Sequence, residues 1–308
     1  MNNYKKDWSA YWKSGFSGSC VANNNDELPA AVKSFWESFC LSSLKNHMQI
    51  LDLCSGGGVL PHLFVKVSDD DLHLTINSTD YSEVKHDTLD LGHKRIQFIA
   101  NCNCEDLPFK ANTYDILTSS YGVEYSDIEK TIPEAKRVMK SGGSFALVIH
   151  TDDSEIVKNV QLQKQQGHFI LEKSGFFNSF KKYYQTKRIG KAFQNSAEKK
   201  LQQALNTIKK QILSYQNPGV FYSVLEAASD TFHFGQNHSP SATIRHIQQM
   251  ERALKQNFNR MKNLQEIVHQ EKTLIKCIKS NGFTISFNKK IKQGHKTYGR
   301  GLICQKLS

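Results

Sequence analysis

The chain has 308 residues, of which 39% are hydrophobic and 22% are charged, and its formal net charge is +11. Such a composition is typical of a soluble globular protein with room for a full core. The longest apolar run near a predicted strand, residues 145–149, is far shorter than the ~20 residues that cross a bilayer. The polar first residues lack the apolar region of a signal peptide, so we expect a cytoplasmic protein that does not contact membranes.

Seven cysteines are present, an odd number, and none shows the paired spacing of a zinc site. Cys102 and Cys104 form the one cluster. On a strand, side chains one residue apart point to opposite faces and do not bind one ion together. We therefore expect no metal.

The first 44 residues are predicted to form a helical segment. Trp8, Tyr11 and Trp12 fall at i, i+3 and i+4, so one helix would carry them on one face. That face would either pack on the core or act as a lid over a ligand site. Residues 28–44 follow with the apolar stripe of a scaffold helix.

Residues 49–60, QILDLCSGGGVL, predict a buried strand, a tight glycine turn and the start of a helix. Glycine is needed where the backbone takes a positive φ or closely approaches a ligand, and the first N–H groups of a helix are free to bind one. A second predicted strand, residues 72–80, ends at Asp80. Its carboxylate suits the two hydroxyls of a ribose, because two oxygens can accept both protons.

Further strands are predicted over residues 95–101, 114–119 and 144–150, with helices over 60–67 and 127–139. Apolar strands separated by helices are typical of a parallel sheet that is covered on both faces. Ligands of such sheets bind at the carboxyl ends of the strands. The tips of the first four strands should therefore converge on one pocket.

Five blocks, ILDLCSGGG, STDYS, CEDLPF, YDILTSSYGVEY and RVMKSGG, resemble in order and spacing the class I S-adenosylmethionine-dependent methyltransferases, in particular the methyltransferase type 11-like group. IKSNGFTISF and YGRGLICQKL resemble the last helix and closing strand pair of that family. The resemblance implies a Rossmann-like, mostly parallel seven-stranded sheet with helices on both faces, an antiparallel last strand and S-adenosyl-L-methionine as cofactor. A dinucleotide dehydrogenase is disfavoured, because the loop is not G-x-G-x-x-G.

The same resemblance implies a role for each cofactor-binding residue. Asp52 and the glycine loop would hold the methionine end, and Asp80 the ribose. Tyr81, Asn103 and Cys104 would meet the adenine, while Ser119 and Tyr121 would flank the methionine portion and the sulfonium. Cys54 replaces the first loop glycine of the family, and Asn103 replaces the usual acid, which should weaken binding. The implied residues are Asp52, Cys54, Ser55, Gly56, Gly58, Asp80, Tyr81, Asn103, Cys104, Ser119 and Tyr121.

Residues 151–275 depart most from a minimal methyltransferase and have a helical pattern. Insertions after the fifth strand of such a sheet begin at its cofactor edge, so we predict a cap over the acceptor. The core would then comprise residues 45–150, closed by the helix end and strand pair of residues 276–308. Residues 231–238, TFHFGQNH, are predicted to form a loop that lines the acceptor pocket.

Residues 181–210 hold nine Lys or Arg side chains against one Glu, and aromatic residues lie among them. This stretch could follow a phosphate backbone and stack bases. It could equally be a solvated helix face whose aromatic side chains (Phe180, Tyr183, Tyr184 and Phe193) point inward. We favour a small-molecule acceptor, with an RNA or tRNA methyltransferase and a non-catalytic S-adenosylmethionine-binding protein as alternatives.

A general base helps methyl transfer when the acceptor carries a proton, although alignment of donor and acceptor supplies much of the rate. The sequence selects no catalytic residue. The candidates are His150, Glu124 and Tyr125 near the strand ends, and His168, His233 and His238 in the insertion.

Overall fold

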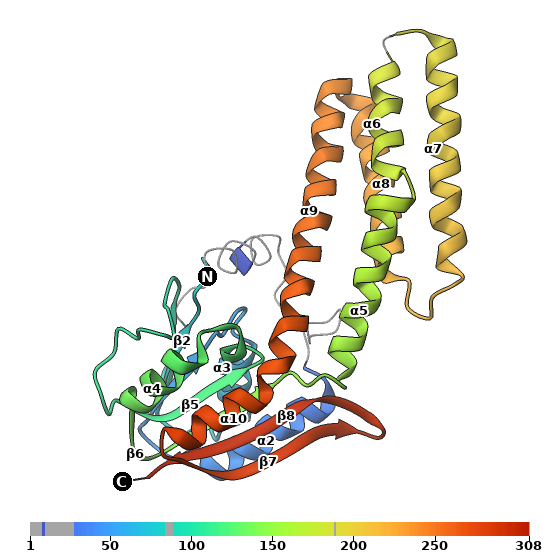
Figure 1. The fold of residues 1–308 in the computed structure, drawn as a ribbon. Helices are drawn as coiled ribbons and strands as arrows, with labels where there is room; N and C mark the ends of the chain where they lie inside the picture. The colour runs from blue at the N-terminus through green and yellow to red at the C-terminus, as the bar shows by residue number, and fades with distance from the viewer. Residues whose placement is uncertain (1–7, 10–27, 84–88, 188, 308) are drawn as a thin grey trace. The chain divides into compact units, whose positions relative to one another are not determined.

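The computed structural model describes residues 8–9, 28–83, 89–187 and 189–307 (Figure 1). The chain divides into two compact units. We call residues Met1–Val157 with Asn263–Ser308 the core unit, and Lys158–Lys262 the helical unit. The whole helical unit falls within the predicted insertion.

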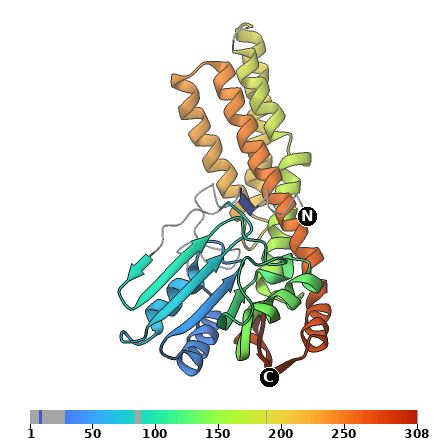
Figure 2. The same ribbon diagram turned by 90° about the vertical axis from the view of Figure 1, so that its left-hand side faces the viewer.

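A sheet in the order β3-β4-β2-β1-β5-β6-β8-β7 forms the centre of the core unit (Figure 2). Strands β4, β2, β1, β5 and β6 are parallel neighbours, and β8 runs antiparallel to both β6 and β7. The predicted seven-stranded, mostly parallel sheet with an antiparallel last strand is therefore confirmed. The strands are β1 (Met48–Leu53), β2 (Leu74–Thr79), β3 (Leu89–Leu91), β4 (Lys94–Ile99), β5 (Tyr114–Ser120), β6 (Met139–Ile149), β7 (Phe283–Gln293) and β8 (Lys296–Lys306).

Two details of the sheet differ from the prediction. The short β3 adds an antiparallel edge strand beside β4. β6 begins at Met139 and not at residue 144, because Met139 already pairs with Tyr114 before a register shift. Gly143 permits this close pairing, since a Cβ there would lie 2.9 Å from the carbonyl oxygen of Asp115.

Helices cover both faces of the sheet, as predicted. On one face lie α2 (Ala30–Ser43) and α3 (Val59–Val67), where the fully buried Trp36 packs against Phe64 at a ring separation of 6.1 Å. On the other face, α4 (Ile128–Val138) and α10 (Glu271–Ser280) share a core cluster with strand residues such as Leu51 and Phe145. Alternate strand residues serve the two layers, because strand side chains alternate between faces.

Strand order reverses at β1, which lies between β2 and β5. In open sheets of this kind, the crevice at such a switch point, outside the carboxyl ends of the strands, is where ligands bind. The glycine turn follows β1 directly, so the fold places it at that crevice.

The helical unit is built on α6 (Phe176–Thr186), α7 (Lys191–Ile212) and α8 (Gly219–Asn237), with parts of α5 (Glu155–His168) and α9 (Pro240–Ile267). Phe180, directly before the basic stretch, and Tyr184 within it are buried in the core of this unit, and Tyr183 packs against them. Phe193 is 62% exposed. Within the ranges given above, no helix has the length and apolar character needed to span a bilayer.

The prediction of a loop over residues 231–238 is wrong, because Thr231–Asn237 forms the last turns of α8. Gly235 lies within this helix, and its small size has a packing reason. A Cβ on Gly235 would collide with the ring and hydroxyl of Tyr184. The glycine therefore lets α8 approach α6 closely and does not break the helix.

Candidate functional site

A cleft lies at the carboxyl ends of β1, β2 and β5 and beside the loop that follows β4. Its lining includes side chains from all four segments and from Trp8 and Leu28. The structure thus brings together residues that are far apart in the sequence. Nine of the predicted cofactor residues line it: Asp52, Cys54, Ser55, Gly56, Asp80, Tyr81, Asn103, Cys104 and Tyr121.

The glycine turn is held in a left-handed backbone conformation, with φ of 55° at Cys54, 53° at Gly56 and 74° at Gly58. Gly58 does not line the cleft and instead precedes the first residue of α3. A cysteine is rare at such a φ, since a Cβ crowds the backbone. Gly122 makes room for it, because a Cβ on Gly122 would collide with the Cβ of Cys54.

Asp80 joins the tips of β1 and β2. Its Oδ2 accepts the N–H of Gly56 at 2.8 Å, and its Oδ1 accepts the N–H of Ser82 at 2.8 Å as well as the Ser82 hydroxyl. The carboxylate is therefore fixed in orientation. Oδ1 already accepts two hydrogen bonds, whereas Oδ2 accepts one and keeps capacity for a further donor. Ser82 also lines the cleft and was missed, although it lies two residues after Asp80 in the STDYS block.

Asp52 is a buried acid at the floor of the cleft, only 2% exposed. Burial raises its pKa to about 7, and the negative charge of Asp80 acts in the same direction. Hydrogen bonds from Thr118, at 2.7 Å, and Ser55 partly offset this rise. An acid with this pKa changes charge near neutral pH.

Cys102 and Cys104 lie in the loop after β4 and not on a strand, so the argument from alternating faces does not apply to them. The sulfur of Cys104 lies 3.8 Å from that of Cys54, and both residues line the cleft. Among the residues that the structure describes, no group of three or more His, Cys, Asp or Glu side chains is arranged to hold a metal ion.

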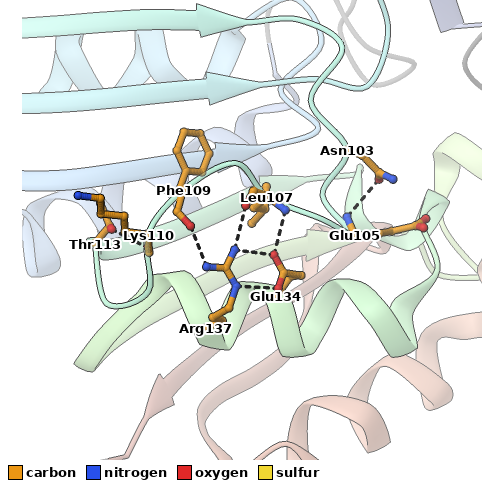
Figure 3. Close-up of polar contacts among 8 residues, drawn as sticks. All are labelled: Asn103, Glu105, Leu107, Phe109, Lys110, Thr113, Glu134 and Arg137. Atoms are coloured by element: carbon orange, nitrogen blue, oxygen red, sulfur yellow. Dashed lines mark hydrogen bonds and ion pairs between the residues drawn. The ribbon is translucent and has the colours of Figure 1, made fainter.

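Asn103 begins a turn whose shape depends on a clamp from α4 (Figure 3). The Asn103 Oδ1 accepts the N–H of Glu105 at 3.1 Å. Arg137 donates to the carbonyl oxygens of Leu107 and Phe109 at 2.9 and 2.7 Å. Glu134 pairs with Arg137 and accepts the Leu107 N–H at 2.9 Å. The E-D-L-P-F segment is thus fixed by helix side chains.

Replacing Arg137 by alanine is expected to lower the free energy of unfolding by about 2 kcal/mol, because two loop carbonyl oxygens lose their donors. The ion pair itself adds little, since the Arg137 side chain is 38% exposed. Urea unfolding of the full chain measures the loss. Lys130→Ala is the control, because Lys130 lies on the same helix in an exposed ion pair with Asp127. Equal losses in both variants would contradict the clamp.

The exit of β5 places its polar residues differently from the prediction. Ser119 is fully buried and does not line the cleft, since its Oγ accepts the N–H of Val123 at 3.2 Å. Ser120, one residue on, lines the cleft instead. Tyr121 also lines it, and its hydroxyl donates to the Tyr298 carbonyl oxygen at 2.8 Å. Burial raises the Tyr121 pKa, so this phenol stays protonated.

The predicted N-terminal lid falls mostly outside the described residues, including Tyr11, Trp12 and Phe16. Trp8 is described, lines the cleft and meets the Tyr125 ring edge-on at 5.4 Å. The hydroxyl of the neighbouring Ser9 accepts the N–H of Glu83 at 3.1 Å. These contacts place two N-terminal residues beside the cleft, and the lid stays a prediction.

The predicted base candidates fall into two groups. Glu124 and His150 are buried against each other in the core unit, and Tyr125 lines the cleft. The other three lie in the helical unit and have local helical contacts there. These are His168 with Glu172, His233 with the Ser229 carbonyl oxygen, and His238 with that of Phe234.

A doubly wound parallel sheet closed by antiparallel strands, with a glycine turn and an acidic strand tip at its switch point, defines a class I S-adenosylmethionine-dependent methyltransferase fold. The model of the ubiE/COQ5 methyltransferase family matches residues 20–217. The chain belongs to this family.

Relatives of the chain include two named methyltransferases. The mitochondrial 2-methoxy-6-polyprenyl-1,4-benzoquinol methylase of Caenorhabditis elegans is 26% identical in an alignment 149 residues long, which covers 44% of this chain and 50% of that protein. The ubiquinone/menaquinone biosynthesis C-methyltransferase UbiE of Rickettsia prowazekii is 31% identical over 130 residues, 39% of this chain and 52% of that protein. The chain thus spans about half the length of the curated relatives it matches.

Among solved structures, a SAM-dependent methyltransferase from Aquifex aeolicus is similar, with 18% sequence identity and a TM-score of 0.35. The match covers 48% of this chain and 75% of that one.

Proposed function

We propose that this chain transfers the methyl group of S-adenosylmethionine to a ring carbon of a small quinol-type acceptor. The observation that carries the methyl-donor part is the convergence of the glycine turn, Asp80 and the Asn103 loop on one cleft. The acceptor class is taken from the names of the benzoquinol methylase and C-methyltransferase relatives.

The lining of the cleft fits the proposed cofactor. Asp80 offers a fixed carboxylate for ribose hydroxyls, and Asp52 offers a buried one for the ammonium group of the methionine end. The turn after Asn103 offers backbone and amide groups to the adenine edge. When bound, the cofactor supplies a methyl group that its positive sulfonium activates.

The residues of this chain would act mainly by alignment. A displacement at carbon needs the acceptor atom in line with the bond that breaks, and holding both partners supplies much of the rate. The apolar and aromatic lining, with Trp8, Tyr121 and Tyr125, would exclude water from the reacting atoms.

The cap role of the helical insertion is also part of the proposal. It is supported by the point at which the chain leaves the sheet, directly after the carboxyl end of β6. The cytoplasmic compartment stays a prediction, and one of the relatives is described as mitochondrial.

Nucleic acid is the weaker alternative. Stacking of bases requires exposed aromatic rings beside the basic residues. Of the four aromatic side chains in and beside the basic stretch, Phe180 and Tyr184 are buried in the helical core, Tyr183 packs against it, and Phe193 is the one that is mostly exposed. Lys181 is paired with Glu251 at 3.0 Å. These observations favour a solvated helix face.

The purified full chain, incubated with S-adenosylmethionine labelled in its methyl group, tests the proposal. The acceptors are a 2-methoxy-6-prenyl-1,4-benzoquinol with a short prenyl tail, its oxidised quinone and total RNA. Label should enter a ring carbon of the quinol alone, because the quinone lacks the electron-rich ring that attacks the methyl carbon. Label in RNA, or cofactor binding without label in any acceptor, would contradict the proposed function.

A further inference from the structure

Glu124 and His150 form a buried pair that takes no part in the cofactor contacts above. Glu124 lies in the 3₁₀ turn η1 (Val123–Tyr125), and His150 follows directly after β6. The two residues are 3% and 2% exposed. The Glu124 Oε1 accepts the backbone N–H of His150 at 3.0 Å and lies 2.7 Å from its Nδ1.

This contact determines which nitrogen of the imidazole carries the hydrogen. The Glu124 Oε1 already acts as an acceptor for the backbone N–H of His150, and with this oxygen as the acceptor Nδ1 is the donor to Glu124. The neutral ring then has a lone pair at Nε2. Glu124 thus fixes both the tautomer and the orientation of His150.

Four buried polar atoms of this pair and its neighbours have no hydrogen-bond partner among the described residues: His150 Nε2, Glu124 Oε2, Ser120 Oγ and Thr151 Oγ1. Buried polar atoms are nearly always paired, and leaving one unpaired costs about 1–3 kcal/mol. Their grouping at the carboxyl ends of β5 and β6 points to a polar ligand group that completes them.

His150 lies directly behind the lining of the cleft. Its ring centre is 4.7 Å from that of Tyr121 and 5.9 Å from that of Tyr125, and both tyrosines line the cleft. Ser120 lines the cleft itself. The orphaned atoms are therefore next to the end of the cleft proposed for the methionine portion, where the acceptor must reach the methyl group.

We propose that His150, held by Glu124, is the general base that takes the hydroxyl proton of the acceptor during methyl transfer. The proposal rests on the proposed function and names a residue for its proton step. Tyr121 does not fill this role, because its hydroxyl already donates to Tyr298 and its raised pKa keeps it protonated.

The quinol, the methyl donor, His150 and water together account for every proton and electron pair that moves in this step. The quinol O–H proton passes to Nε2, and the ring carbon next to the hydroxyl uses an electron pair to bond to the methyl carbon. The carbon–sulfur bond breaks with its electron pair on sulfur, which becomes a neutral thioether. His150 then returns its proton to the ring oxygen, the ring C–H proton leaves to water, and the ring is aromatic again. Glu124 stabilises the transient imidazolium.

His150→Asn is the first test, because the amide N–H of asparagine can still donate to Glu124 while the Nε2 atom is deleted. With the labelled quinol assay, kcat is expected to fall by about hundredfold or more, whereas KM for the cofactor stays within about twofold. Glu124→Gln should lower kcat by about tenfold, because the imidazolium loses its counter-charge. His47→Asn is the matched control, since His47 is exposed before β1 and has a φ of 62°, which asparagine tolerates.

The pH profile separates a base from a structural residue. The wild-type kcat should rise with pH along a limb that His150→Asn lacks. Replacing Tyr121 or Tyr125, whose rings lie beside that of His150, by phenylalanine should keep this pH dependence, whatever the change in kcat itself. A kcat within threefold of wild type in folded His150→Asn would overturn the assignment.

A measurement without acceptor keeps the inference testable when the assay or the variant fails. In the ¹⁵N-histidine NMR spectrum of the full chain near pH 8, His150, assigned by its absence from His150→Asn or from His150→Gln, should show a protonated Nδ1 and a free Nε2. The opposite tautomer would refute the base. If the wild type labels no acceptor, the proposed function is refuted. If the wild type and His150→Asn label the quinol at the same rate, only the assignment of His150 as the general base is refuted.

Discussion

Replacing Asp80 by alanine is expected to weaken the binding of S-adenosylmethionine by about hundredfold or more. The carboxylate is the proposed acceptor for the ribose hydroxyls, and each hydrogen bond to a charged group contributes about 1.5–3 kcal/mol. The loss of one such bond corresponds to about one to two factors of ten in Kd, and the release of the glycine turn adds to it.

The same substitution would also release the glycine turn. Gly56 donates its N–H to the Asp80 Oδ2, and Ser82 donates to Oδ1, so the side chain joins the ends of β1 and β2. Without it, the turn loses its fixed N–H direction, and the cofactor must order it on binding. Both effects lower affinity.

Calorimetric titration of the full chain with the cofactor measures the change. Asp71→Ala is the matched control, because it removes the same charge from an exposed residue before the amino end of β2. Its Kd should match that of the wild type. Unchanged binding in a folded Asp80→Ala variant would refute the proposed cofactor site, and equal weakening in both variants would reduce the effect to net charge.

The cleft was predictable because its parts are local in sequence. A strand, a glycine turn and a helix start are consecutive residues, and an acid at a strand tip follows from the strand's own end. The parallel sheet then brings these tips to one edge without any further information. That is why nine predicted residues line the cleft.

The features that the sequence did not predict correctly have a different physical cause. Ser119 and Ser120 differ by one residue, and side chains alternate along a strand, so a local pattern does not say which serine lines the cleft. The helical state of residues 231–238 depends on the contact of Gly235 with Tyr184, a residue on another helix. The short β3 depends on pairing with β4. Each was determined by a tertiary contact.

The pairing of Glu124 with His150 was equally hidden. The two residues are separated by α4 and β6 in the chain and meet only because β5 and β6 are neighbours in the sheet. Sequence reasoning named both as candidates and had no means to select them. The selecting signal is the unpaired Nε2, which only a three-dimensional structure can give.

Binding of S-adenosylmethionine is expected to weaken about hundredfold between pH 8 and pH 5, because Asp52 must be ionised to hold the ammonium group of the methionine end. Burial raises the Asp52 pKa to about 7, so the carboxyl is mostly ionised at pH 8 and protonated at pH 5. Each pH unit below the pKa then lowers affinity about tenfold. Kd measured by calorimetry across this range tests the expectation.

Asp52→Asn separates this acid from the other groups that titrate in the same range. The variant should bind weakly at every pH, with a flat profile, whereas Asp71→Ala should keep the wild-type slope.

The stability of the cofactor-free protein should fall as pH rises, whereas the affinity for the cofactor should increase. Folded Asp52 holds its proton more tightly than the unfolded side chain, whose pKa is near 3.8. The free energy of unfolding therefore falls as pH rises from about 4 to about 7, and levels off above that. A wild-type Kd that stays constant from pH 5 to 8 would show that the buried acid does not hold the cofactor. A melting temperature that rises with pH over this window more in the wild type than in Asp52→Asn would show that the Asp52 pKa is not raised.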